Sequence, residues 1–214
     1  KIMQFHALHV VTVRVFPTSD RLNIPVVLDC IDCLGLNFRA RADRISFNLV
    51  KKAVFLFEAE RIARYEKQCV NLSHCSIFVS QHDLSIAGNE RSVWLPNFCR
   101  ISERIVDCCD ENTLVISGNF NYWPNIEGVQ HFIPIFKRLR AEYPGLLLKL
   151  CGKVRKSVGE ALSREDGVEA LGYVEDMGQE LSKAMIIVVP VFAGSGMQNK
   201  VIEALAAGRP LVVS

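Results

Sequence analysis

The chain has 214 residues, half of them hydrophobic, and a formal net charge of +2. This length is sufficient for one large domain or two smaller ones with cores of their own. The near-neutral net charge gives no electrostatic indication of a nucleic-acid partner, and no segment has the pattern of a signal peptide or a membrane span. We therefore expect a cytoplasmic protein without a nucleic-acid partner.

The first part of the chain alternates apolar runs with one long helical pattern. Residues 5–16 are consistent with a strand or short helix, and residues 24–36 with a buried parallel strand bounded by Pro25 and Gly35. Residues 46–72 carry apolar side chains at helical spacing, which predicts an amphipathic helix. Two short strands follow, CSIFVSQHD at 75–83, ending in a polar loop, and VWLPNF at 93–98.

The pattern weakens between residues 98 and 111 and then begins afresh with the apolar run TLVISGNF. From there strands alternate with helices to the last residue, which favours βαβ units and parallel sheets. We predict a first unit at 1–97, an interdomain linker at 98–111 and a second unit at 112–214. The first unit has no opening strand with a phosphate-binding turn, and the chain stops on an apolar strand. We therefore expect a fold truncated at both ends.

Eight cysteines are present, and Cys30 and Cys33 have C-x-x-C spacing. Such spacing can signal a redox or metal site, but no second ligand pair follows at similar spacing. Most of the cysteines lie among valine, isoleucine and leucine, where thiols pack as small hydrophobes. We favour the packing interpretation over metal or redox chemistry and infer a reducing compartment.

The stretch VVPVFAGSGMQNKVIEALAAGRPLVVS, residues 188–214, predicts a strand, a glycine-rich loop, a helix and a second strand. Gly194 and Gly196 flank Ser195, and such a loop before a helix N-terminus suits phosphate. Lys200 adds a cation, and Glu203 lies three residues further on the same helical face, where it could accept hydrogen bonds from sugar hydroxyls. The pattern fits a nucleotide ribose beside its diphosphate, but an ordinary surface Lys–Glu pair fits it equally well.

Residues 190–214 closely resemble the donor-site motif of retaining GT-B glycosyltransferases of the family 4, or group 1, type. The resemblance extends through the segment SGNFNYWPN to CGK (117–153), GVEALGYVED (167–176) and VWLPNF (93–98). Residues 26–38 and 57–83 resemble a sugar-transferase branch of the same family. The resemblance implies a GT-B fold, with two Rossmann-like parallel-sheet domains, in which residues 1–97 are the back half of the acceptor domain.

The resemblance also implies a role for individual residues at the donor site. Glu203 would bind the ribose hydroxyls, with Lys200 and the backbone of 195–197 near the diphosphate. The turn after residue 117 would face the phosphates across the cleft, and the turn at 172–174 would frame the base. The implied donor-binding residues are Gly118, Asn119, Gly172, Tyr173, Val174, Gly194, Ser195, Gly196, Met197, Lys200 and Glu203. Asp176 either caps the following helix or touches the ligand, and we favour the cap.

One position departs from the family pattern. Many relatives have a second glutamate eight positions before the ribose-binding one, where it contacts the donor sugar, and here that position is Ser195. His9 lies near the position of a cleft histidine in the family and is therefore a candidate catalytic residue. A core or surface role for His9 is the alternative that we favour.

The function implied by the resemblance is transfer of a sugar, with retention, from a nucleoside diphosphate sugar to a hydroxyl acceptor in cell-surface or exopolysaccharide assembly. Helix N-termini and a lysine can stabilise the leaving diphosphate, so no metal ion or other cofactor is expected. The alternatives are a nucleotide-sugar-binding module without catalysis and a GT-B sugar-nucleotide epimerase. We expect the segment by itself to be inactive.

Residues 38–68 carry eight basic and four acidic side chains. This excess suggests peripheral docking on the inner face of an anionic membrane that holds a lipid-linked saccharide acceptor. A solvated helix face is the alternative, and from the sequence it is the interpretation that we favour.

Overall fold

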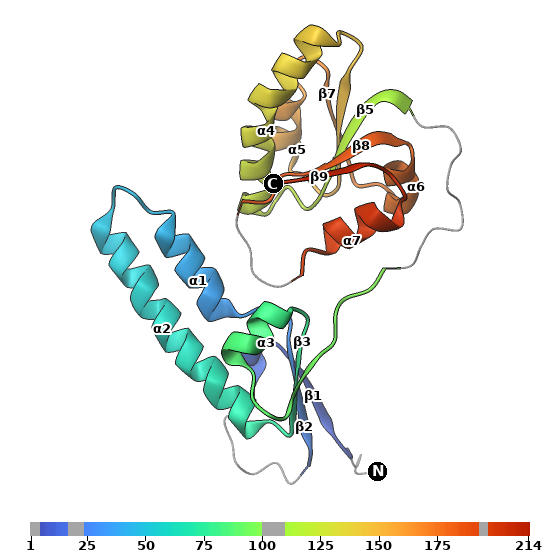
Figure 1. Ribbon diagram of the computed structural model, residues 1–214. Coiled ribbons are helices and arrows are strands. Elements are labelled where there is room, and N and C mark those ends of the chain that lie inside the picture. The colour runs from blue at the N-terminus through green and yellow to red at the C-terminus, as the bar shows by residue number, and fades with distance from the viewer. Residues whose placement is uncertain (1–4, 17–23, 100–109, 193–196) are drawn as a thin grey trace. The chain divides into compact units, whose positions relative to one another are not determined.

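In the computed structural model, residues 5–16, 24–99, 110–192 and 197–214 are described. The described residues up to Asn97 form one compact unit (Figure 1), and residues 98–192 with 198–214 form another. The assignment of the first unit to an acceptor domain stays a prediction. Most of the predicted linker, residues 100–109, lies outside the described residues, and the next strand already begins at Asp110.

The first unit contains a sheet of four parallel strands in the order β1-β2-β3-β4. Its elements are β1 (Leu8–Val11), a 3₁₀ turn (Val13–Val15), β2 (Val26–Cys30), α1 (Leu34–Asp43), α2 (Leu49–Leu72), β3 (Cys75–Phe78), α3 (Gln81–Ala87) and β4 (Ser92–Trp94). The core lies between one face of this sheet and the helices, where Leu28 and Phe78 pack with Cys69 and Val70 of α2.

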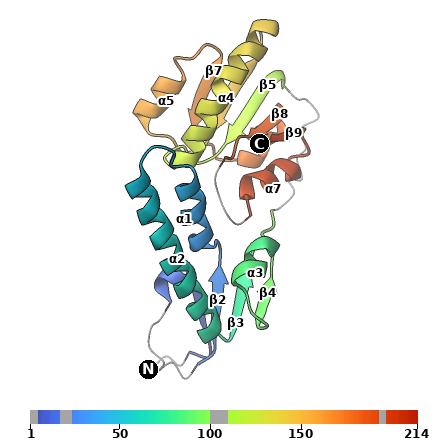
Figure 2. The ribbon, with the colours of Figure 1, turned by 60° about the vertical axis from the view of Figure 1, so that its left-hand side comes forward.

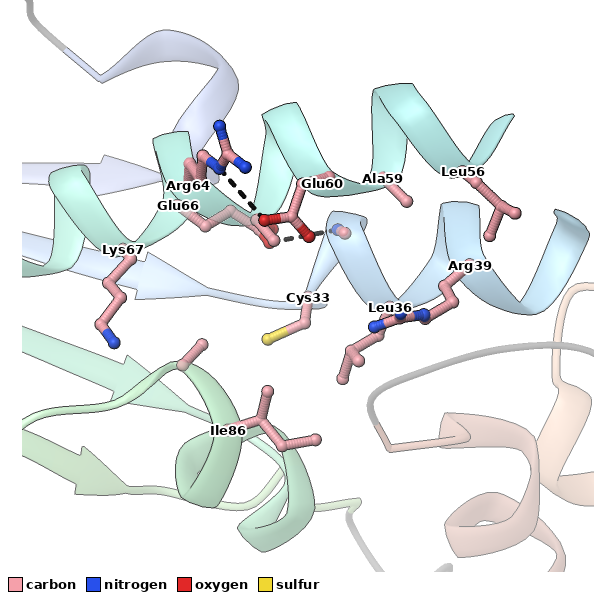
Figure 3. A pocket seen from close by; sticks show the side chains of 13 residues that line it. Cys33, Leu36, Arg39, Leu56, Ala59, Glu60, Arg64, Glu66, Lys67 and Ile86 are labelled. Carbon is pink, nitrogen blue, oxygen red and sulfur yellow. Dashed lines mark hydrogen bonds and ion pairs between the residues drawn. The ribbon is translucent and has the colours of Figure 1, made fainter. Parts of the chain in front are cut away.

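Helices α1 and α2 form a hairpin whose loop end projects beyond the sheet (Figure 2). The amphipathic helix predicted at 46–72 is confirmed, since Ala59 and Cys69 of α2 are buried, but the buried face also carries the carboxylate of Glu66. Glu66 accepts hydrogen bonds from the backbone N–H of Leu34 (2.6 Å) and of Gly35 (3.1 Å). The carboxylate therefore caps the N-terminus of α1 from the neighbouring helix (Figure 3).

Two expectations for this unit were wrong. The apolar run at 24–36 is not one strand, because β2 ends at Cys30 and α1 begins at Leu34. The polar segment after β3 is not a loop but helix α3, which Ser80 caps by accepting a hydrogen bond from the Asp83 N–H (3.3 Å). Asp83 in turn accepts a hydrogen bond from the Cys33 N–H (3.3 Å). Both helix starts depend on side-chain caps, which the apolar pattern does not register.

The second unit contains five parallel strands in the order β7-β6-β5-β8-β9. Its elements are β5 (Asp110–Ser117), α4 (Trp123–Glu142), β6 (Leu147–Cys151), α5 (Lys156–Leu162), β7 (Val168–Gly172), α6 (Met177–Ser182), β8 (Ala184–Val189), α7 (Asn199–Ala206) and β9 (Leu211–Val213). The predicted strands and helices are confirmed, and α5 is an element that the sequence pattern did not predict.

Helices cover both faces of this second sheet. On one face Val129, Ile133 and Phe136 of α4 pack on β5 and β6, and on the other face Leu181 of α6 and Ala204 of α7 pack on β5 and β8. The strand order reverses between β5 and β8, which makes the carboxyl ends of these two strands the topological switch point. In open α/β sheets ligands bind at this point. We therefore expect the ligand-binding site at the loops after β5 and β8.

Candidate functional site

Glycines occupy the carboxyl ends of three neighbouring strands of the second unit. Gly118 follows β5, Gly152 follows β6 and Gly172 ends β7. The Gly118 N–H donates to the Cys151 carbonyl (3.0 Å), and the Gly152 N–H donates to the Gly172 carbonyl (2.7 Å). Gly152 has a φ of +134°, and a Cβ there would overlap the Gly118 carbonyl oxygen. Only glycine at position 152 therefore lets the two turns approach so closely.

Lys200 joins the two helices that follow the strands of the switch point. Its Nζ on α7 donates a hydrogen bond to Asn125 Oδ1 on α4 (2.7 Å), and Asn125 Nδ2 donates to the Asn119 carbonyl oxygen (2.9 Å). Lys200 is half-buried, and burial lowers the pKa of its amine while the charge of Glu203 raises it. A cation is thus held at the start of α7, close to the turn after β5, as an anion-binding site requires.

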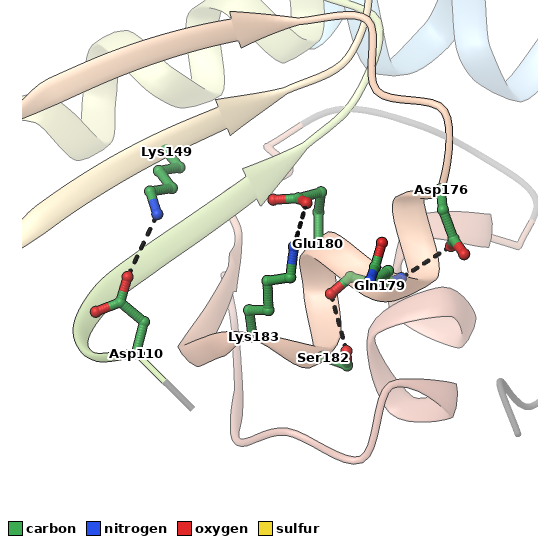
Figure 4. Close-up of polar contacts among 7 residues, drawn as sticks. All are labelled: Asp110, Lys149, Asp176, Gln179, Glu180, Ser182 and Lys183. Atoms are coloured by element: carbon green, nitrogen blue, oxygen red, sulfur yellow. Dashed lines mark hydrogen bonds and ion pairs between the residues drawn. The ribbon is translucent and has the colours of Figure 1, made fainter. Parts of the chain in front are cut away.

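Glu203 lies one turn after Lys200 and lines a pocket of ≈ 330 Å³ between α6 and α7. Asp176, Met177 and Gly178 at the start of α6 line the same pocket. Asp176 Oδ1 accepts a hydrogen bond from the Gln179 N–H (2.9 Å), which confirms that this carboxylate caps α6 (Figure 4). With the Asp176 carboxylate engaged on the helix, Glu203 supplies the pocket with a carboxylate that can accept hydrogen bonds from ligand hydroxyls.

The predicted base-side turn follows β7 and leads to this pocket. Gly172 has a φ of +73°, Tyr173 is exposed, and Val174 packs against the core under α6 and α7. Met197 precedes α7. Three of the predicted donor-site residues, Gly194, Ser195 and Gly196, lie outside the described residues. The role of each predicted residue toward a donor stays a prediction.

Two residues of the site are not among those predicted from the sequence. Asn125 lies 75 positions before Lys200, and nothing in its surrounding sequence connects the two. Gly152 could have been found from the sequence, because the strands at 110–117 and 147–151 are each followed by a glycine and the strand at 168–172 ends at one. That repeated ending is a signal for backbone turns crowded along one edge of a parallel sheet.

His9, the candidate catalytic residue, lies on β1 with its side chain mostly exposed, and its Nε2 is 3.6 Å from Asp29 Oδ2 on β2. The neighbouring Val10 is buried in the core, so His9 points to the opposite face of the sheet. His9 therefore lies on the surface of the first unit, and its role in catalysis stays a prediction.

The two cysteines of the C-x-x-C pair are buried in the core of the first unit. Burial, reinforced by nearby carboxylates, raises the pKa of Cys30 to about 12 and that of Cys33 far above its ordinary value. Protonated thiols are poor nucleophiles and poor metal ligands, which supports the packing interpretation. Over the described ranges no three His, Cys, Asp or Glu side chains gather in a manner suited to a metal ion. Cys108 and Cys109 lie outside those ranges.

A second pocket, of ≈ 360 Å³, lies in the first unit among α1, α2 and α3. Its two acidic residues already have partners, since Glu66 caps α1 and Glu60 pairs with Arg64 (3.1 Å; Figure 3). This pocket therefore offers no unengaged carboxylate for acid–base chemistry. Within the described part of the chain no helix is both long enough and apolar enough to cross a lipid bilayer.

Solved structures of low sequence identity share this fold. TarM matches with a TM-score of 0.70 and 16% identity over 97% of this chain and 40% of its own. WaaG, a glycosyltransferase involved in lipopolysaccharide biosynthesis, matches with a TM-score of 0.61 and 14% identity over 92% and 60%. HepE of Anabaena, in complex with UDP, matches with a TM-score of 0.59 and 17% identity over 89% and 53%. The chain thus spans between 40% and 60% of these proteins, and the predicted GT-B fold with two parallel-sheet α/β domains is confirmed.

A sequence comparison finds a family model that matches the second unit. Residues 111–214 match the profile of the family described as "Glycosyl transferases group 1". This segment contains the sheet, the switch point, Lys200 and Glu203. Among curated protein sequences none gives a significant match. The predicted glycosyltransferase domain is therefore supported for the second unit.

Proposed function

We propose that the chain forms part of a retaining glycosyltransferase of family 4, which moves a sugar from a nucleoside diphosphate sugar to a hydroxyl acceptor. One observation carries the proposal. Lys200 and Glu203 lie one turn apart on α7 at the switch point, the first bonded to Asn125 and the second lining the pocket beside α6. This spacing fits a diphosphate next to a ribose, the two parts that all such donors share.

The chemistry would depend on charge that develops during the reaction. As the bond between the anomeric carbon and the diphosphate breaks, negative charge builds on the leaving diphosphate while the sugar becomes cationic at that carbon. The acceptor oxygen then bonds to the anomeric carbon, and the acceptor proton can pass to the leaving diphosphate. Lys200 and the N–H groups at the start of α7 would stabilise that charge without a metal ion. Glu203 would hold the ribose and so fix the diphosphate relative to Lys200.

UDP is the first nucleotide to test, because HepE, TarM and the pneumococcal O-GlcNAc transferase GtfA, a further structure that this chain resembles, have each been solved in complex with UDP. We place the activity in cell-surface polysaccharide assembly, on the cytoplasmic side, by analogy with WaaG, which is involved in lipopolysaccharide biosynthesis. A lipid-linked saccharide is the acceptor class that such a location offers.

The test is a thermal-shift series with UDP, GDP, ADP and their sugars on the protein and on Glu203→Ala. We expect one nucleotide to raise the melting temperature of the wild type, and the variant to lose most of the shift. Glu160→Ala, which removes an exposed glutamate from α5, is the matched control and should respond like the wild type. Equal shifts in both variants would refute the donor site. Because the segment by itself is expected to be inactive, products are measured with the full-length protein. Nucleotide binding without sugar transfer there, or an epimerised donor as product, would favour the two alternative functions.

A further inference from the structure

Exposed apolar side chains gather at the loop end of the α1–α2 hairpin. Phe47, in the loop, is 101% exposed, and Leu49, the first residue of α2, is 76% exposed. Val50, Val54 and Phe57 follow on α2 with exposures of 76%, 55% and 64%. We call these five residues the apolar tip.

The apolar tip is not the packing face of α2. Val50, Val54 and Phe57 follow the spacing i, i+4, i+7, which places them on one side of the helix. The side that packs toward α1 carries Phe55, Ala59 and the buried Glu66. By the helical period the two sets lie on opposite sides, so α2 has a second apolar stripe that the first unit leaves in solvent.

The charge around the apolar tip is strongly one-sided. Between residues 39 and 57 there are five basic side chains and one acidic side chain, Asp43. Arg39, Arg41, Arg44 and Lys51 are exposed and Lys52 is partly so. The acidic residues that balance the hairpin, Glu58, Glu60 and Glu66, all lie further along α2, toward the sheet. The loop end of the α1–α2 hairpin therefore combines solvent-exposed apolar side chains with surrounding basic side chains.

We propose that this hairpin end docks on an anionic lipid surface. Apolar side chains of an interfacial helix enter the headgroup region, and flanking lysines and arginines pair with anionic lipids. Charge complementarity selects this partner over a second copy of the chain, because two such cationic ends would repel each other. The inference does not depend on the donor site, since it concerns residues of the first unit alone.

The sequence alone favours a solvated face for this segment, and the structure changes that preference. Basic residues on a solvated helix need no apolar neighbours, whereas here five exposed apolar side chains lie among them. Large exposed apolar groups collected at one place mark interaction surfaces.

The experiment is flotation of the full chain with phosphatidylcholine vesicles, with and without phosphatidylglycerol, at low and high salt. We expect binding only to the anionic vesicles, weakened by salt. Val54→Ser/Phe57→Ser should weaken it about ten-fold or more. Lys51→Gln/Lys52→Gln should weaken it roughly thirty-fold, from ~1 kcal/mol per charge near the surface.

Two matched controls remove the same groups elsewhere. Ile86→Ser/Ile135→Ser replaces two exposed apolar residues, and Lys156→Gln/Arg164→Gln removes two exposed charges. Both controls should bind like the wild type, and circular dichroism would establish that every variant folds. The proposal is overturned if anionic vesicles are not bound, if tip and control variants bind equally, or if sedimentation shows a dimer that the tip variants dissociate. Vesicle binding by Glu203→Ala should be unchanged, which separates this proposal from the donor site.

Discussion

Lys200 is the residue whose charge connects the structure most directly with nucleotide binding. Burial lowers the pKa of its amine, so in the free protein this lysine loses its proton at a lower pH than an exposed lysine does. A bound diphosphate would favour the charged amine and raise its pKa again. Protonation of Lys200 and binding of a donor should therefore be linked.

This linkage predicts proton uptake on nucleotide binding at alkaline pH. Between the lowered pKa and the ordinary value of 10.5, binding should draw a proton from the buffer. Calorimetry in buffers of different ionisation enthalpy would measure the uptake. Lys200→Arg, which stays protonated, should bind without it, and Lys200→Met should bind roughly 10- to 100-fold more weakly through loss of a charge-assisted hydrogen bond. Uptake that persists unchanged in Lys200→Arg would assign the proton to another group.

For individual residues, the sequence predicts contacts between near neighbours along the chain but not contacts between residues that are far apart in it. The spacing of Lys200 and Glu203 follows from the helical period, and the capping role of Asp176 follows from its place before α6. Asn125 could not be predicted from the sequence, because its hydrogen bond with Lys200 forms only when β5 and β8 lie side by side in the sheet. The close approach of Gly152 to Gly118 could not be predicted for the same reason, because it requires the pairing of β5 with β6.

Among the elements, α1 depends on a partner from another helix. Its N-cap residue, Cys33, makes no side-chain capping hydrogen bond, and Glu66 of α2 provides the acceptors instead. Burial raises the pKa of the Glu66 carboxyl, an effect that the hydrogen bonds from Gly35 and Leu34 partly oppose. A group whose pKa is raised by folding stabilises the folded protein below its unfolded value, and this contribution is lost as the pH rises through the folded value.

Glu66→Ala should lower the free energy of unfolding by about 2–4 kcal/mol, because two backbone N–H groups lose their acceptor. Glu66→Gln should cost less, and it should also remove the part of the pH dependence that begins near the ordinary value of 4.5 and extends upward. Urea unfolding at several pH values would measure both effects. Glu58→Ala, which breaks an exposed pair with Arg61 on the same helix, is the control and should cost at most ~0.5 kcal/mol. A cost for Glu66→Ala no larger than for this control would contradict the capping role.

Some helices and strands are specified by a local apolar pattern in the sequence, and others depend on caps that such a pattern does not show. Buried strands such as β8 are continuous apolar runs and were predictable from that pattern alone. Helices α1, α3 and α5 were missed because they are short or weakly amphipathic, and two of them depend on caps. The glutamate that caps α1 comes from 32 positions away, beyond any local signal.

For the whole molecule, the separate cores of the two units predict two steps of unfolding. The buried cluster around Leu28 and Phe78 lies in the first unit, and the clusters around Phe136 and Ile187 lie in the second. Because Glu203 belongs to the second unit and Glu66 to the first, ligand and mutation should act on different transitions. In calorimetry UDP should raise only the transition of the second unit, and Glu66→Ala should lower only that of the first. The Glu203→Ala variant should lose the UDP effect and nothing else, which identifies the transition that belongs to the second unit. A single transition that UDP and Glu66→Ala both shift would instead show that the two units unfold cooperatively.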